Sequence, residues 1–223
     1  MAENESSQGH QEGRTGFEPY SAFEIPEDLR ELHGRYDVVT TARRIRNYRY
    51  AEEWMMMIMA GWVATIPELP VKTGLGKIIY QDSIHADWLG NRLPELRGGR
   101  SLRNASVSGN EGFAELIQEI AGPEDAELTI EKLVGIFRVL KPHLIEVFET
   151  NIRETDQISD APTIELLQDT IRRTREHIEW GEQVFEKLIN SPEKRERAQN
   201  REQELRLLLE KCGGVCGDLA RAG

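Results

Sequence analysis

Apolar side chains recur every three or four residues over four long stretches of the chain, which is the spacing of one face of a helix. These stretches lie between Asp37 and Pro67, between Pro70 and Gly98, from about Pro123 to Thr155, and from Asp160 to about Leu188. Neither Pro67 nor Pro70 can continue a helix, so we expect the first two helices to separate there. Pro142 predicts a bend in the third helix. Asp160 is expected to cap the fourth helix, with Pro162 in its first turn.

The connections between these helices differ in length. The first and third connections are short, whereas the second contains a Gly-, Ser-, Asn- and Arg-rich segment from about Arg97 to Gly112. A short helix over Phe113 to Ala121 follows, and we expect it to cover one end of the bundle. No stretch alternates apolar and polar residues as a strand does. The pattern therefore predicts an all-α protein: a ferritin-like antiparallel four-helix bundle with a crossover between its second and third helices.

The two ends of the chain have a different pattern from this bundle, which we assign to residues 23–190. Residues 1–22 are polar and lack periodic apolar positions, so we expect a disordered N-terminal tail. Residues 191–223 predict an extra polar helix followed by a Gly-rich tail. Apolar residues of that helix concentrate between Leu205 and Leu209, so we expect it to dock only near its end. The same leucines are a candidate contact patch for a homodimer.

Composition and charge narrow the classes of function. The 223 residues include 28 basic and 39 acidic ones, a net charge of −11, which is the wrong sign for binding nucleic acid or an anionic membrane. We find no membrane-spanning run and no signal peptide, and expect a cytoplasmic protein. Cys212 and Cys216 are the only cysteines, so no disulfide framework is expected, and a single Cys-x-x-x-Cys pair is not the spacing of a zinc site.

Several polar side chains share the apolar faces of the predicted helices. They are Glu52 in the first helix, Asp82 and His85 in the second, Glu149 at the margin of the third, and Thr174 and His177 in the fourth. Residues three apart lie on the same face of a helix, so Asp82 and His85 form one pair, and Thr174 and His177 another. Burying ionisable groups without a partner is costly, so such groups bind each other or a ligand.

Segments of the chain also resemble bacterial ferritin-like domain proteins of the di-iron carboxylate superfamily. The resemblance rests on YAEEWMMMIMAGW at 50–62, IYQDSIHADWLGNRLPEL at 79–96, and the DAPT and EWG motifs within 156–181, and it covers roughly residues 37–190. It implies the ferritin-like fold. The superfamily includes iron-dependent oxygenases and oxidases, and also proteins that have lost their metal ligands.

Di-iron bundles take a Glu from each of two helices and a Glu-x-x-His pair from each of the other two. Asp82-x-x-His85 matches one pair, whereas Thr174-x-x-His177 has a hydroxyl group in place of a carboxylate, which leaves two iron ions, one, or none as alternatives. The predicted metal ligands are Glu52, Asp82, His85, Glu149 and His177.

Two functional hypotheses follow from this ligand set. The first is an iron-dependent oxidoreductase that acts on a small organic substrate with O2. The second is a metal-free ligand-binding or scaffolding bundle, in which the same polar groups form a hydrogen-bonded network around a degenerate di-iron site.

Overall fold

A computed structural model describes most of the chain, and all of the described residues belong to the unit formed by residues 33–223. The described residues are 34–96, 108–123 and 125–218. They form helices and no strand, which confirms the all-α prediction for this part of the chain. None of these helices is long and apolar enough to cross a membrane. The tail predicted at residues 1–22 lies outside the described residues, as does most of the loop predicted from Arg97 to Gly112.

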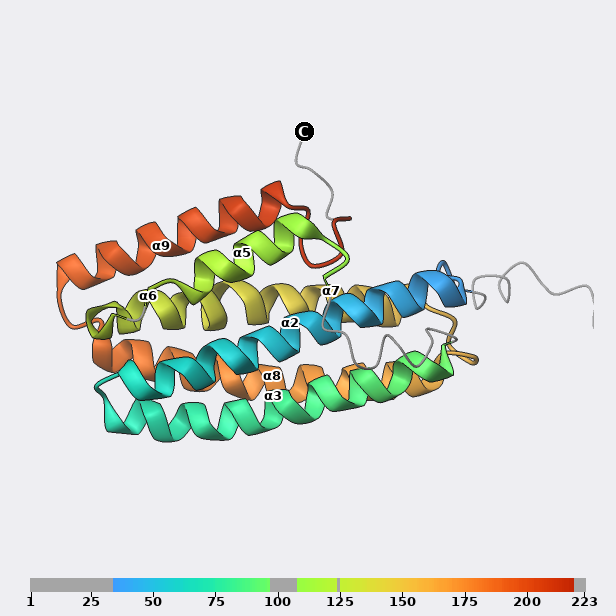
Figure 1. Cartoon of the computed structure of the whole chain (residues 1–223), viewed down its shortest axis with the longest axis horizontal. Coiled ribbons are helices and arrows are strands. Elements are labelled where there is room, and N and C mark those ends of the chain that lie inside the picture. Colours follow the sequence, from blue (N-terminus) through green and yellow to red (C-terminus); the bar gives the residue numbers. More distant parts are fainter. Residues whose placement is uncertain (1–33, 97–107, 124, 219–223) are drawn as a thin grey trace, which may run out of the picture. The chain divides into compact units, whose positions relative to one another are not determined.

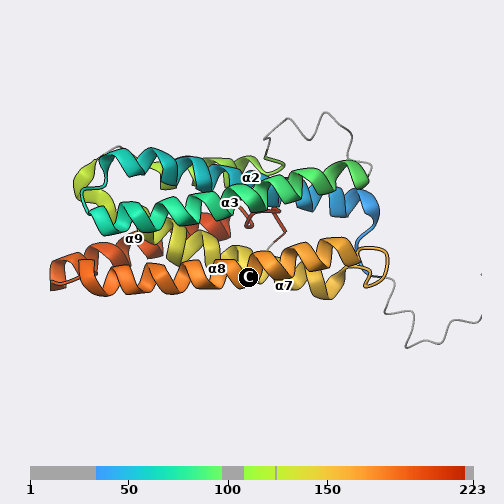
Figure 2. The same ribbon diagram turned by 90° about the horizontal axis from the view of Figure 1, so that it is seen from below.

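The first two long helices are α2, Val38–Thr65, and α3, Leu69–Glu95. They lie side by side and run in opposite directions (Figures 1 and 2). Asp37 begins α2, because its carboxylate accepts a hydrogen bond from the backbone N–H of Thr40 at 2.7 Å. Pro70 lies in the first turn of α3, where the missing N–H needs no partner within the helix. Pro70 therefore starts the second helix, and the break between the helices is shorter than predicted.

The third long helix consists of four successive segments that change in helical type. They are η3, Ala126–Leu128; α6, Thr129–Val134; the π-helical segment η4, Gly135–Leu140; and α7, Lys141–Glu154. Pro142 lies in the first turn of α7, directly after η4. An ordinary residue at that position would donate its N–H to the carbonyl of Arg138. The guanidinium of Arg206 donates to this carbonyl at 2.9 Å instead. The disturbance expected at Pro142 thus takes the form of a π-helical segment.

The fourth long helix is α8, Ala161–Leu188, and Asp160 lies at its start as predicted. Asp160 is the N-cap residue of α8, and its backbone carbonyl accepts from the N–H groups of Thr163 and Ile164, but its carboxylate makes no capping hydrogen bond. The carboxylate instead accepts from the hydroxyls of Thr155 and Thr163 at 2.6 and 2.5 Å, and from Arg92 at 3.0 Å. These bonds tie the start of α8 to α3 through Arg92.

Two further helices pack on this group: α5, Glu111–Ala121, and α9, Pro192–Lys211. The helix α5 lies alongside α9 and also contacts α2, where Trp62 donates to the carbonyl of Ala121 at 3.2 Å (Figure 1). It does not cover an end of the bundle, so that prediction is wrong. The docking predicted near the end of α9 is present but is not limited to that end, because Ala198 in the first half of the helix is also buried. Leu205 and Leu209 are buried as well, whereas Leu207 is exposed, so the predicted leucine patch is mostly covered within the chain.

The directions of the long helices can be followed in Figure 1. The helices α2 and α8 run one way, and α3 and the segment from α6 to α7 run the other way, while α5 lies in the connection between α3 and α6. The helix α3 also contacts α8, and α7 contacts α8. The predicted apolar stripe of the third helix is confirmed, since its members are fully buried. They are Leu133, Phe137, Leu140, Leu144, Phe148 and Asn151.

Candidate metal centre

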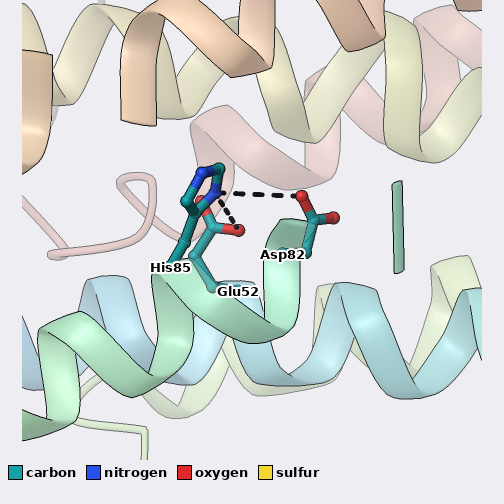
Figure 3. A group of neighbouring side chains, drawn as sticks. All are labelled: Glu52, Asp82 and His85. Carbon is teal, nitrogen blue, oxygen red and sulfur yellow. Dashed lines mark ion pairs between the residues drawn. The ribbon is translucent and has the colours of Figure 1, made fainter. Parts of the chain in front are cut away.

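Three ionisable side chains meet between α2 and α3 in the buried interior. Glu52 comes from α2, and Asp82 and His85 come from one face of α3; none of the three is exposed to solvent. One ligand atom from each residue lies within 4.8 Å of the others (Figure 3). The Nδ1 atom of His85 is 3.7 Å from Oε2 of Glu52 and 4.0 Å from Oδ1 of Asp82. Two atoms that are each about 2.1 Å from one metal ion lie about 3 to 4 Å apart, so these distances suit a shared ion.

Glu52 and His85 have ligand atoms that no group of the protein uses. Neither oxygen of Glu52 and neither ring nitrogen of His85 has a hydrogen-bond partner among the described residues. Leaving buried polar atoms unpaired is costly, and native proteins rarely do so without a ligand or another compensation. Carboxylate oxygen and imidazole nitrogen are ligands that iron, manganese and zinc accept. The donor set therefore fits a divalent metal ion, and Glu52, Asp82 and His85 would hold it.

Lys141 is a fourth fully buried ionisable residue, which the sequence analysis missed as a site residue. Its Nζ atom lies 2.9 and 2.8 Å from the two carboxylate oxygens of Asp82. A signal was present, because Lys141 follows Phe137 by four residues and precedes Leu144 by three, which places it in the apolar stripe. Lysine is almost never fully buried without a partner, and the partner here comes from another helix.

His177 joins the group through Asp82, as predicted from the fourth helix. Its side chain is almost fully buried, and its Nδ1 atom lies 3.4 Å from Oδ1 of Asp82. Its Nε2 atom donates to the side-chain oxygen of Gln81 at 2.5 Å, so Nδ1 carries the free lone pair. Thr174, one turn away on α8, is also buried, and its hydroxyl has no hydrogen-bond partner among the described residues.

Glu149 is the predicted ligand that the structure does not bring to this group. Its carboxylate is 45% exposed and pairs with Arg175 at 2.5 Å on the outside of α7 and α8. Glu149 directly follows Phe148, which is fully buried, and one residue along a helix turns the side chain by about 100°. A position next to the stripe therefore faces away from the core.

Burial shifts the pKa values of two residues in the group, Asp82 and His177. It raises the pKa of Asp82 to about 6, with the Glu52 charge adding to the rise and the Lys141 ammonium opposing it. Burial also lowers the pKa of His177 to about 2, and the nearby Lys141 charge acts in the same direction. The His177 ring is therefore neutral at physiological pH and offers a lone pair rather than a charge.

A groove of about 670 Å³ between α3 and α8 reaches this group from the surface. Gln81 and His177 line it together with the apolar side chains of Ile78 and Trp180. The groove therefore connects the exterior to His177, whose ring lies next to Asp82.

Comparison with known proteins gives this chain no relatives: no protein-family model matches it, and no curated protein or solved structure is significantly similar. The resemblance to ferritin-like proteins is therefore not confirmed at the level of family. The helical architecture and the buried group of Glu52, Asp82 and His85 are compatible with it.

Proposed function

We propose that this protein is a ferritin-like, iron-dependent oxidoreductase that acts on a small organic substrate with O2. The single observation that carries the proposal is the set of unpartnered ligand atoms on Glu52 and His85, fully buried beside Asp82. A site that keeps four polar atoms away from water and from other protein groups is prepared for a ligand that binds all of them.

The helix directions support the ferritin-like part of the proposal. Two antiparallel pairs, α2 with α3 and the α6 to α7 segment with α8, are joined by one long connection that contains α5 (Figure 1). One long crossover between two antiparallel pairs is the connectivity of ferritin-like bundles. The candidate ligands also come from the corresponding helices, with a carboxylate on the first and a carboxylate-x-x-His pair on the second.

The side chains of this site have separate parts in such a reaction. Glu52, Asp82 and His85 hold the ion and keep it away from bulk water, because all three are fully buried. Bound iron would supply one-electron and O2 chemistry. His177 keeps its own proton on Nε2 through the bond to Gln81, so the Nδ1 atom next to Asp82 offers a lone pair, and the neutral ring lies between the groove and Asp82. Ile78 and Trp180 give the groove apolar walls, which suit a small organic molecule.

Metal analysis tests the proposal directly. Purified protein is loaded with Fe(II) without oxygen and desalted, and bound iron is measured by mass spectrometry. Wild-type protein is expected to retain iron in stoichiometric amount, and the His85→Gln variant to lose it. The matched control is His143→Gln, which also replaces a buried histidine but one whose ring accepts a hydrogen bond from the backbone of Val215. That control should retain iron.

Oxygen uptake tests the redox part of the proposal. Iron-loaded wild-type protein should consume O2 faster than the same amount of iron mixed with the His85→Gln variant. Equal rates would show that the site does not promote oxygen chemistry, even if it binds iron.

A metal-free ligand-binding or scaffolding bundle is the second candidate, and the pair of Lys141 with Asp82 favours it. Lys141 balances the Asp82 charge inside the protein without any metal. Iron below about a tenth of an equivalent in loaded wild-type protein would select this candidate.

A further inference from the structure

The two sides of the candidate centre differ in what they leave free for a metal. On one side, Glu52 and His85 have no hydrogen-bond partners within residues 34–96, 108–123 and 125–218, so their ligand atoms are available. On the other side, both oxygens of Asp82 accept hydrogen bonds from the ammonium group of Lys141. Asp82 thus differs from Glu52 and His85, because a cation of the protein already binds its carboxylate.

The balance of the buried charges also favours one metal ion over two. The groups that face one another are the carboxylates of Glu52 and Asp82, the ammonium of Lys141 and the ring of His177, which is neutral, together with His85. An imidazole that binds a metal ion is neutral, so the two carboxylates and the ammonium of the metal-binding state together carry one negative charge. One divalent ion changes this to one positive charge, whereas two ions would bury three positive charges in a dry interior. Uncompensated buried charge is strongly unfavourable.

The donor atoms on the Lys141 side are also too few for a second ion. Besides Asp82, that side offers the Nδ1 atom of His177 and the hydroxyl of Thr174. A neutral hydroxyl cannot bridge two cations as a carboxylate does. Two-metal bundles place carboxylates on the third helix and in the pair on the fourth. Here the third helix places Lys141 against Asp82, and the fourth has the buried Thr174 one turn before His177.

We infer that the ammonium group of Lys141 takes the place of a second metal ion, so that the centre binds one divalent ion between Glu52, Asp82 and His85 and excludes a second. This inference rests on the proposed function, since it requires that a metal binds at all. Lys141 is then the residue that sets the number of ions, acting through its contact with Asp82.

Manganese stoichiometry and electron paramagnetic resonance test this inference without relying on activity. Wild-type protein titrated with Mn(II) should bind one ion per chain and give the spectrum of an isolated ion. The double variant Lys141→Glu, Thr174→Glu should bind twice as much Mn(II), and its spectrum should show two magnetically coupled ions, because two-metal sites hold their ions about 3.5 to 4 Å apart. Far-ultraviolet circular dichroism checks that this variant remains helical.

The matched control is Thr174→Glu alone, which adds a carboxylate and keeps the ammonium of Lys141. It should still bind a single ion. Two ions in this control or in wild-type protein would overturn the inference, as would a single ion in the folded double variant. If the double variant fails to fold, the counts for the control and the wild type still decide the question. Wild-type protein that binds no Mn(II), like His85→Gln, would instead overturn the proposed function.

Discussion

Two buried polar clusters of this protein use their hydrogen-bonding groups in opposite ways. The first is the candidate metal centre, where Glu52 and His85 leave their ligand atoms unpaired. The second is the Arg44 network, which consists of Arg44, Tyr48 and Asn151. In the network, Nε of Arg44 donates to the hydroxyl of Tyr48 at 3.0 Å and to the side-chain oxygen of Asn151 at 3.2 Å. The Tyr48 hydroxyl donates to the same Asn151 oxygen at 3.0 Å.

The comparison shows that burial of polar groups does not by itself identify a functional site. Arg44 and Tyr48 are as deeply buried as the candidate ligands, but they bind each other and join α2 to α7. The side-chain nitrogen of Asn151 has no partner among the described residues, but its oxygen accepts two of these hydrogen bonds. A network of this kind stabilises one arrangement of helices. Glu52 and His85 make no hydrogen bonds of this kind with the described residues, which leaves their ligand atoms for the proposed metal ion.

The largest effect is expected when the buried partner of Lys141 is removed. In metal-free protein, Asp82→Asn should lower the free energy of unfolding by about 3 to 5 kcal/mol, because it leaves a fully buried ammonium without a counter-charge. Urea unfolding followed by circular dichroism measures the change. The double variant Asp82→Asn, Lys141→Met should recover much of the loss, since the uncompensated charge is gone. A loss below about 1 kcal/mol in the single variant would show that the ion pair is not buried in solution.

A smaller effect is expected from adding metal. If the centre binds Mn(II), a free concentration one hundred times the dissociation constant should raise the free energy of unfolding by about 2.7 kcal/mol. The gain should disappear in His85→Gln and remain in His143→Gln, whose ring lies against the backbone of Val215. Urea unfolding with and without Mn(II) measures it. An equal gain in His85→Gln would mean that the ion binds elsewhere on the acidic chain.

We expect His143 to lower the free energy of unfolding as the pH falls. Burial lowers its pKa from 6.5 to about 4, so the folded protein binds a proton there less readily than the unfolded chain. The stability that depends on neutral His143 is present above pH 6.5 and is lost as the pH falls from 6.5 towards 4. This shift corresponds to about 2 kcal/mol between pH 8 and pH 5.

The physical reason is the acceptor role of the His143 ring, because Nε2 receives the N–H of Val215 at 3.0 Å and cannot do so when protonated. Urea unfolding at pH 8 and pH 5 should show a smaller change for His143→Gln than for wild type, by about this amount. Equal changes in the two proteins would show that His143 stays neutral in the unfolded chain or is not buried.

The long helices could be predicted from sequence because their apolar stripes are continuous and buried. The stripe of the third helix predicted its buried face, and Asp82, His85 and His177 were assigned to the interior for the same reason. Periodicity could not predict which residue binds a buried polar side chain. Lys141 lies in the stripe of its own helix, but the carboxylate that makes its burial acceptable belongs to α3, fifty-nine residues away in sequence.

Positions at the margin of a stripe were predicted less well. Glu149 lies next to Phe148 and turned out to face Arg175 at the surface, since a single residue step is enough to leave the core. Ala198 was missed for the opposite reason, because one small apolar residue in a highly charged helix gives little periodic signal although it packs closely. Site residues were therefore predictable where they sat in the centre of an apolar stripe.

The smallest effect is expected at the outer edge of the Arg44 network, where Asp218 pairs with Arg44. The side chain of Arg44 is only 5% exposed, whereas that of Asp218 is 54% exposed, so water and salt screen this pair far more than the pair of Asp82 with Lys141. Asp218→Asn should therefore lower the free energy of unfolding by less than about 1 kcal/mol, and the loss should shrink in high salt. Urea is the suitable denaturant, because it carries no charge of its own.

Both Asp218→Asn and Asp82→Asn remove the carboxylate partner of a buried cation. Arg44 keeps Tyr48 and Asn151 as partners. Lys141 instead loses the only side-chain partner found for it among the described residues. Equal losses in the two variants would show that the depth of the cation, rather than what remains to bind it, sets the cost.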